Sequence, residues 1–126
     1  MKVQDKIKWW ADGLCLALCY MELFGIKNDE DKLKIASEAL RQGFIDWTGF
    51  VQNPIGLARL CGHTEVKDVR KVTTYDGHDT VIAYYTNNNY GHFVLVKDGE
   101  VVWNSLEKSV CVEKGHIDSY RIIITN

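Results

Sequence analysis

The hydrophobic pattern of the chain changes period near its midpoint. In the first half, apolar residues recur at the spacing of one helix face. From Glu65 onward they alternate with a period of two and are enriched in β-branched and aromatic types. Helices followed by antiparallel strands are typical of the α+β class. Because the 126 residues contain no linker-like stretch, we expect a single domain over residues 1–126.

Capping residues mark the ends of three expected helices in the first half. Asparagine and aspartate supply N-caps, and glycines supply the left-handed residue that ends a helix. The first helix is expected to follow Asp12-Gly13 and end at Gly25, the second to run from Asn28 or Asp29 to about Gln42 before Gly43, and the third to run from Asn53-Pro54 to Gly62.

Short apolar runs separated by turn residues predict an antiparallel meander in the second half. Strands are expected near residues 65–75, 80–86, 91–97, 100–105, 109–112 and 117–124. The fold class that follows is α+β, with N-terminal helices packed on a C-terminal antiparallel β-sheet.

Charge and hydropathy narrow the classes of partner. A net charge of −2 and a pI near 6.1 provide no basic field for nucleic acid or an anionic membrane surface. No apolar run approaches the roughly 20 residues of a membrane-spanning helix. The stretch 14–26 is the most similar to a signal peptide, but it contains Glu22 and lacks a small-residue cleavage site. We therefore expect a cytoplasmic protein whose four cysteines are free thiols.

Cys15 lies in the first turn of the first expected helix. There, unpaired N–H groups and the helix dipole stabilise a thiolate, and the preceding Gly13 lets a substrate approach the backbone. Cys19 lies one turn further along, where the dipole has faded. Since buried free cysteines also serve as small core residues, position alone leaves both interpretations of Cys15 open.

His92 has a different setting from the other three histidines, which lie in turns. It opens an almost continuous apolar run, residues 92–96, where a buried ring needs a hydrogen-bond partner. Asn104, at the end of the next expected strand, offers an amide oxygen to a ring N–H. A cysteine at a helix start followed by histidine and asparagine on adjacent strands indicates a Cys-His-Asn catalytic arrangement.

These motifs resemble those of papain-like cysteine peptidases. The segments Gly91-His92-Phe93-Val94-Leu95-Val96 and Val101-Val102-Trp103-Asn104-Ser105 are similar to their His and Asp/Asn motifs, and Gly13-Leu14-Cys15-Leu16-Ala17-Leu18-Cys19 resembles the opening of their nucleophile helix. The resemblance is greatest to the bacteriocin-leader-processing peptidases of ABC transporters. The tail from residue 103 to 122 also resembles an uncharacterised, cysteine-peptidase-like family of phages and spirochaetes.

The resemblance implies a papain-like fold and a thiol hydrolase that acts on a peptide or amide bond of a peptide or protein substrate. Cys15 would be the nucleophile, His92 the base and Asn104 the orienting partner, with no cofactor or metal. One departure concerns the oxyanion hole. Papain-like enzymes usually carry a glutamine shortly before the nucleophile, but here Trp9 occupies that position and Gln4 lies further upstream. The sequence therefore leaves the second oxyanion donor unassigned.

Two alternatives remain beside the hydrolase. The first is a catalytically inactive papain-like module that binds a partner protein, since a fold does not guarantee its chemistry. The second is a zinc site formed by Cys15, Cys19, Cys61 and His63, although the C-x3-C and C-x-H spacings are unusual for structural zinc.

The turn between the two motif strands decides whether His92 and Asn104 share a face of the sheet. A two-residue Asp98-Gly99 turn would place His92 opposite Ser105 and send Asn104 to the other face. A three-residue loop over residues 97–99 would place His92 directly opposite Asn104. We predict the three-residue loop, with Gly99 at positive φ, because it also stacks Phe93 on Trp103.

Overall fold

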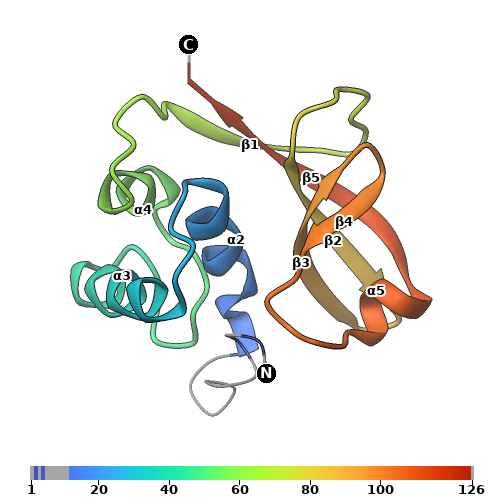
Figure 1. Cartoon of the computed structure of the whole chain (residues 1–126), viewed down its shortest axis with the longest axis horizontal. Coiled ribbons are helices and arrows are strands. Elements are labelled where there is room, and N and C mark those ends of the chain that lie inside the picture. The colour runs from blue at the N-terminus through green and yellow to red at the C-terminus, as the bar shows by residue number, and fades with distance from the viewer. Residues whose placement is uncertain (1, 3, 5–11, 126) are drawn as a thin grey trace.

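A computed structural model describes residues 2, 4 and 12–125 of the chain. Figure 1 shows the helices of the first half packed together on one side and a twisted sheet on the other. A 3-10 turn, η1 (Asp12–Leu14), leads into α2 (Cys15–Leu23), which is followed by α3 (Asp29–Gln42) and α4 (Pro54–Leu60). The three expected helices are therefore confirmed, and Cys15 is the first residue of α2.

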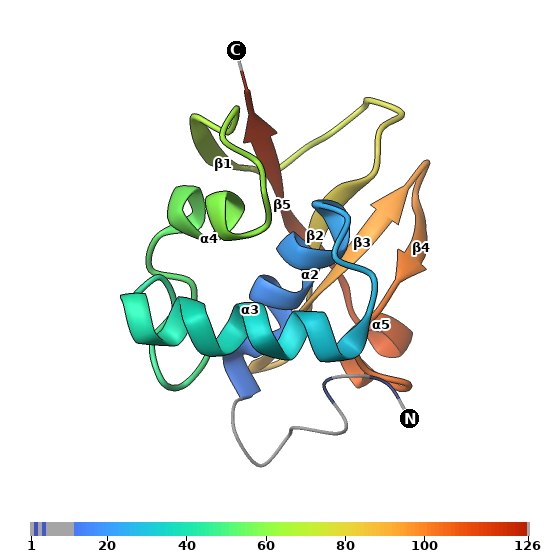
Figure 2. The ribbon, with the colours of Figure 1, turned by 60° about the vertical axis from the view of Figure 1, so that its left-hand side comes forward.

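The expected caps account for where α3 and α4 begin and end. The Asn28 side chain accepts hydrogen bonds from the first backbone N–H groups of α3, and Gly43 ends that helix in the left-handed conformation with φ 78°. Asn53 Oδ1 accepts from Gly56 N at 2.9 Å, and Pro54 occupies the first turn of α4. Figure 2 shows α3 crossing in front of α2.

The sheet contains β1 (Asp68–Val72), β2 (Val81–Asn87), β3 (Tyr90–Lys97), β4 (Glu100–Trp103) and β5 (His116–Ile124). All of the pairings are antiparallel, and the strand order is β1-β5-β2-β3-β4. The predicted meander is therefore correct for β2, β3 and β4 and wrong for β1 and β5. The last strand returns to lie between β1 and β2, where both of its edges are hydrogen-bonded.

The strand expected at 109–112 is wrong, because this segment forms the short helix α5 (Val110–Lys114). Ser109 O accepts from Glu113 N at 3.0 Å, and Gly115 N donates to Cys111 O at 3.0 Å, which closes a single helical turn. The turn buries Cys111 and packs Val112 partly against the sheet. The helical turn therefore buries part of this apolar segment at the point where the chain reverses direction before β5.

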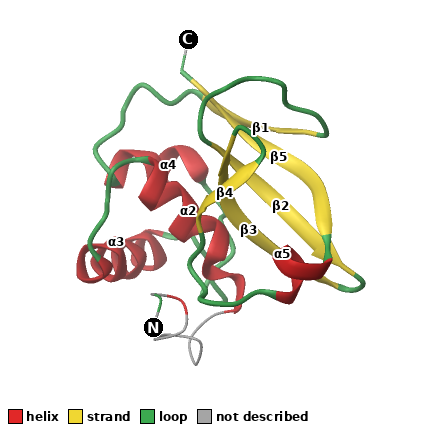
Figure 3. Cartoon of the chain, turned by 45° about the vertical axis from the view of Figure 1, so that its right-hand side comes forward, coloured by secondary structure: helices red, strands yellow, loops and turns green. Residues whose placement is uncertain are grey.

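The two faces of the sheet are covered by different helices. Leu95 of β3 faces the core formed with α2, α3 and α4, whereas Val94 and Val96 face a smaller cluster that includes Val112 of α5. Figure 3 shows α5 at one end of the sheet, apart from the other helices. Because side chains alternate along a strand, His92 lies on the same face as Val94 and Val96.

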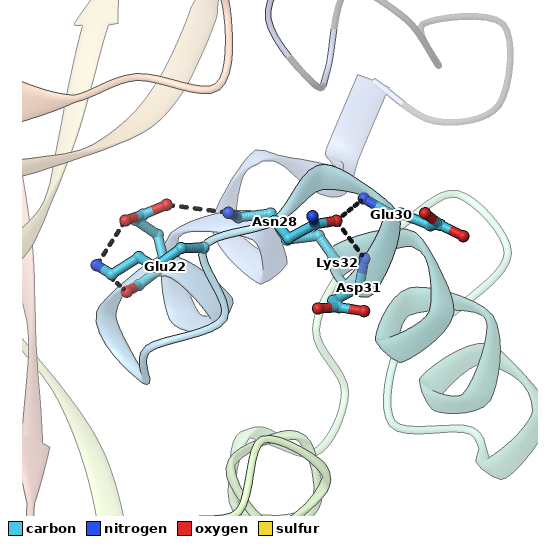
Figure 4. Close-up of polar contacts among 6 residues, drawn as sticks. Glu22, Asn28, Glu30, Asp31 and Lys32 are labelled. Atoms are coloured by element: carbon cyan, nitrogen blue, oxygen red, sulfur yellow. Dashed lines mark hydrogen bonds and ion pairs between the residues drawn. The ribbon is translucent and has the colours of Figure 1, made fainter.

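A buried ion pair joins α2 to α3 (Figure 4). Lys32 is 1% exposed, and its Nζ lies 2.9 Å from Glu22 Oε1 and 5.3 Å from the centroid of the Trp103 ring. Lys27 Nζ lies 2.6 Å from the other Glu22 oxygen. Burial alone would raise the pKa of Glu22, but the hydrogen bonds from Lys27 and Lys32 outweigh it and lower that pKa.

No helix within the described part of the chain combines the length and apolar character needed to cross a membrane.

Candidate functional site

The predicted three-residue turn between β3 and β4 is wrong. Lys97 pairs with Glu100, so the turn contains two residues, Asp98 and Gly99, both at positive φ (51° and 81°). These dihedral signs are those of a type I′ turn, whose twist matches that of the strands it joins. The expected positive φ of Gly99 is confirmed.

A β-bulge after this turn returns Asn104 to the face of His92. Val96 pairs with Val101 but Leu95 pairs with Trp103, so Val102 is an additional residue on β4. Continuing this register places Asn104 opposite Val94, two residues along β3 from His92, and not directly opposite His92 as expected. The expected stacking of Phe93 on Trp103 is replaced by contact with Tyr84, whose ring centroid lies 4.5 Å from that of Phe93.

His92 and Asn104 nevertheless form the expected hydrogen bond. His92 Nε2 lies 2.7 Å from Asn104 Oδ1, and the His92 side chain is buried. The same oxygen accepts from Leu106 N at 2.9 Å, and a backbone N–H can only donate. Oδ1 is therefore the acceptor in both bonds, and Nε2 carries the ring proton. In the neutral ring, Nδ1 is then the nitrogen that can accept a proton.

Cys15 meets the sheet at the residue that follows His92. The backbone N–H groups of Phe93, Leu16 and Cys15 itself act on its sulfur and stabilise the thiolate. The pairing of β3 with β4 covers Leu95 to Lys97, so the Cys15 sulfur meets β3 at Phe93, beyond the end of that ladder. The fold thus brings Cys15 to the strand that carries His92, and His92 to Asn104.

Burial opposes the effect of the three N–H groups on the pKa of the Cys15 thiol. The Cys15 side chain is 7% exposed, and its desolvation raises the pKa of the thiol above the ordinary value despite those hydrogen bonds. The neighbouring Cys111 adds to this increase in pKa. A thiol in this environment keeps its proton at neutral pH, so it becomes a nucleophile when a base removes that proton.

A pocket of about 580 Å³ opens beside His92. Its walls come from the β2–β3 turn, the start of β3 and the segment that leads into α5. They include Tyr90, Leu106, Val110 and Gln4. The mixture of apolar side chains and a few convergent polar groups is typical of a site that binds an organic ligand. A second hollow, of about 380 Å³, lies near Phe24 and Arg121 at the other end of α2.

Gln4 and Ser105 belong to this site, although the sequence pattern did not assign them to it. Ser105 Oγ donates to Gln4 Oε1, and Gln4 N donates to Ser105 O at 3.0 Å. Both side chains are buried. Adjacent residues therefore orient two different groups, since Asn104 holds the His92 ring and Ser105 holds the Gln4 carboxamide. Trp9, the residue at the expected glutamine position, lies outside the described residues.

Cys111 is a third residue that the sequence pattern does not assign to the site, because the pattern predicts a strand there. It is buried in α5, lines the pocket that contains His92, and influences the thiol of Cys15. The signal that could have indicated this helix is Ser109, an N-cap type of residue, with Gly115 ending the turn.

The four-ligand zinc arrangement is not formed. Both ring nitrogens of His63 have other partners, with Nδ1 2.6 Å from Glu65 Oε1 and Nε2 2.9 Å from Phe24 O. Among the residues that the structure describes, no group of three or more His, Cys, Asp or Glu side chains is arranged to hold a metal ion. All four cysteines are free and buried.

Fold and geometry together define an α+β protein with a cysteine at the start of α2, whose sulfur meets the backbone of Phe93, and with a buried histidine, His92, that is hydrogen-bonded to Asn104. The chain belongs to the family described as a protein of unknown function, DUF261, whose family model matches residues 3–125. Comparison with curated proteins and with solved structures gave no match.

Proposed function

We propose that this protein is a papain-like thiol hydrolase that cleaves a peptide or amide bond. Cys15 is the nucleophile, His92 the base and Asn104 the residue that orients it. The observation that carries the proposal is the bond from His92 Nε2 to Asn104 Oδ1, on the strand whose next residue contacts the Cys15 sulfur. Because this bond leaves the proton off Nδ1, the ring is in the tautomer that a base requires.

The chemistry then follows in two steps. In the first, Cys15 Sγ attacks the carbonyl carbon while its proton passes to His92 Nδ1, and the C–N bond of the resulting adduct breaks as His92 protonates the leaving amine. In the second, water attacks the acyl-thioester, His92 takes a proton from that water, and the C–S bond breaks to release the acid and restore the Cys15 thiol.

Gln4 is proposed as the second donor to the oxyanion, beside the Cys15 N–H. Its carboxamide lines the pocket that contains His92, and the hydroxyl of Ser105 fixes its orientation. A side-chain amide can stabilise the negative oxygen that develops on the attacked carbonyl. Gln4 thus supplies the donor that the residue pattern around Trp9 left unassigned.

We also propose that the protein acts in the reducing cytoplasm. All four cysteines are free, and a disulfide at Cys15 would remove the nucleophile. One observation favours the alternative of an inactive module that binds a partner, because burial raises the pKa of Cys15. The two functions predict different reactivities for the Cys15 thiol. In a hydrolase, Cys15 reacts faster than a buried thiol that has no base, whereas in an inactive module it does not.

Selective alkylation tests which thiol is the nucleophile. In the folded protein, Cys15→Ala is expected to abolish rapid modification by iodoacetamide, because Cys15 has the three N–H groups and, in the proposed mechanism, His92 as its base. Cys19→Ala, Cys61→Ala and Cys111→Ala are matched controls that remove other buried thiols and should leave the rapid phase intact. Mass spectrometry of time-resolved samples measures the result. Loss of the rapid phase in Cys111→Ala, with retention in Cys15→Ala, would assign the nucleophile to α5 instead.

A further inference from the structure

The segment between α3 and α4 contains a short loop, residues 46–50, whose backbone is closed on itself. Ile45 and Val51 form an antiparallel bridge at its base. Within it, Asp46 N donates to Phe50 O at 2.9 Å, and Gly49 N donates to Asp46 O at 2.9 Å, with Gly49 at φ 96°. Only glycine adopts such a φ without strain, so the backbone of this aromatic loop is fixed by its own sequence.

The carboxylate of Asp46 ties the aromatic loop together from inside. Its Oδ1 accepts from Thr48 Oγ1 at 2.6 Å, from Thr48 N at 3.0 Å and from Phe50 N at 3.1 Å. These bonds, led by that from the Thr48 hydroxyl, lower the pKa of Asp46, so the carboxylate remains ionised at neutral pH. Since its negative charge is directed into the loop, the loop can present an apolar surface.

The loop holds two large apolar side chains in solvent. Trp47 is 74% exposed and Phe50 is 58% exposed. A loop that is ordered by so many bonds, yet leaves its tryptophan in water, gains little stability from that side chain. Exposed aromatic side chains on a rigid loop are typical of surfaces that bind an apolar group of another molecule.

This surface lies directly beside the start of α2. Gly13 N donates to Thr48 O at 3.3 Å, two residues before Cys15. A Cβ atom at Gly13 would lie 2.9 Å from Thr48 O and 3.0 Å from the Phe50 ring, so the ring covers the backbone just ahead of the nucleophile. Figure 2 shows the segment from α3 to α4 passing near the lower end of α2. The loop therefore lies against Gly13, two residues before Cys15, and its residues are separate from those that line the pocket beside His92.

We propose that residues 46–50 form a recognition loop for a large apolar, preferentially aromatic, side chain of the substrate, next to the bond that Cys15 attacks. Trp47 provides the main contact with this substrate side chain, and Phe50 lies beneath that contact, against the backbone of Gly13. The substrate class is then a peptide with an aromatic residue adjacent to the cleaved bond. This inference rests on the proposed function, because it places the loop relative to Cys15 as nucleophile.

Two alkylating reagents that differ in one group test the loop without a known substrate. Iodoacetamide and N-(2-phenylethyl)iodoacetamide react identically: the thiol sulfur bonds to the methylene carbon, iodide leaves and the thiol proton passes to His92. The quantity measured is the ratio of the two rate constants at Cys15, divided by the same ratio for free cysteine. An aromatic contact is expected to raise this normalised ratio about tenfold in the native protein.

Trp47→Ala should return the normalised ratio to near one, because it removes the ring that binds the phenyl group. Val101→Ala is the matched control, since Val101 is also an exposed apolar residue (37%) but lies on β4 opposite Val96, and it should preserve the native ratio. Asp46→Ala should lower the ratio by releasing the loop. A native ratio near one, with rapid His92-dependent labelling of Cys15 by iodoacetamide, would overturn the recognition loop alone. Slow labelling that is independent of His92 would overturn the proposed function.

Discussion

Replacing His92 by alanine is expected to slow alkylation of Cys15 at neutral pH by about 10²–10⁴-fold, the range typical of a lost general base. The physical reason is that burial raises the pKa of this thiol, so little thiolate forms without a group to accept its proton. The rate of iodoacetamide modification at Cys15, followed by mass spectrometry at several pH values, measures the effect.

The pH dependence distinguishes a lost base from a disturbed fold. In His92→Ala, the thiolate fraction should grow about tenfold with each pH unit below the raised pKa of Cys15, so the deficit should shrink in alkali. In the native protein, the rate of the proposed amide hydrolysis should be a bell-shaped function of pH, because acid removes the base form of His92 and alkali removes the form that protonates the leaving amine. Equal rates in native protein and variant across this range would exclude the Cys15–His92 pairing.

Replacing Glu22 by glutamine is expected to lower the free energy of unfolding by about 3 kcal/mol at pH 7. The variant leaves the Lys32 ammonium, which is 1% exposed, without a carboxylate in the interface between α2 and α3. Urea unfolding followed by circular dichroism measures the difference. Because the pKa of Glu22 is lowered in the folded protein, its contribution is complete above the unfolded pKa and is lost as pH falls through the folded value. The difference between native protein and variant should therefore shrink in acid.

Lys32→Met is the control for this buried pair. It removes the buried charge but keeps an unbranched apolar side chain near Trp103, while Glu22 retains Lys27 at 2.6 Å. The change in the free energy of unfolding should therefore stay within about 1 kcal/mol. A loss as large as that of Glu22→Gln would mean that the ammonium itself stabilises the fold, through Trp103 or through its bond to Glu22, and that an unpaired charge is not the main cost in the glutamine variant.

The sequence by itself determined the local elements. The caps at Asn28 and Asn53 and the stop at Gly43 define α3 and α4 because hydrogen bonds between neighbouring residues decide where a helix begins and ends. The period-two pattern likewise predicted the strands that carry His92 and the residues before Asn104. It failed at residues 110–114, where one short apolar run fits either a strand or a helical turn.

Only the tertiary structure decided how distant segments meet. Asp98-Gly99 accepts either turn, and the bulge at Val102, which restores Asn104 to the face of His92, depends on how β4 packs. The position of β5 between β1 and β2, and the bond between Ser105 and Gln4, likewise depend on contacts between residues far apart in the sequence. Local patterns report the hydrogen bonds and periodicity of one segment, whereas register and side-chain convergence are set by packing energies summed over the whole core.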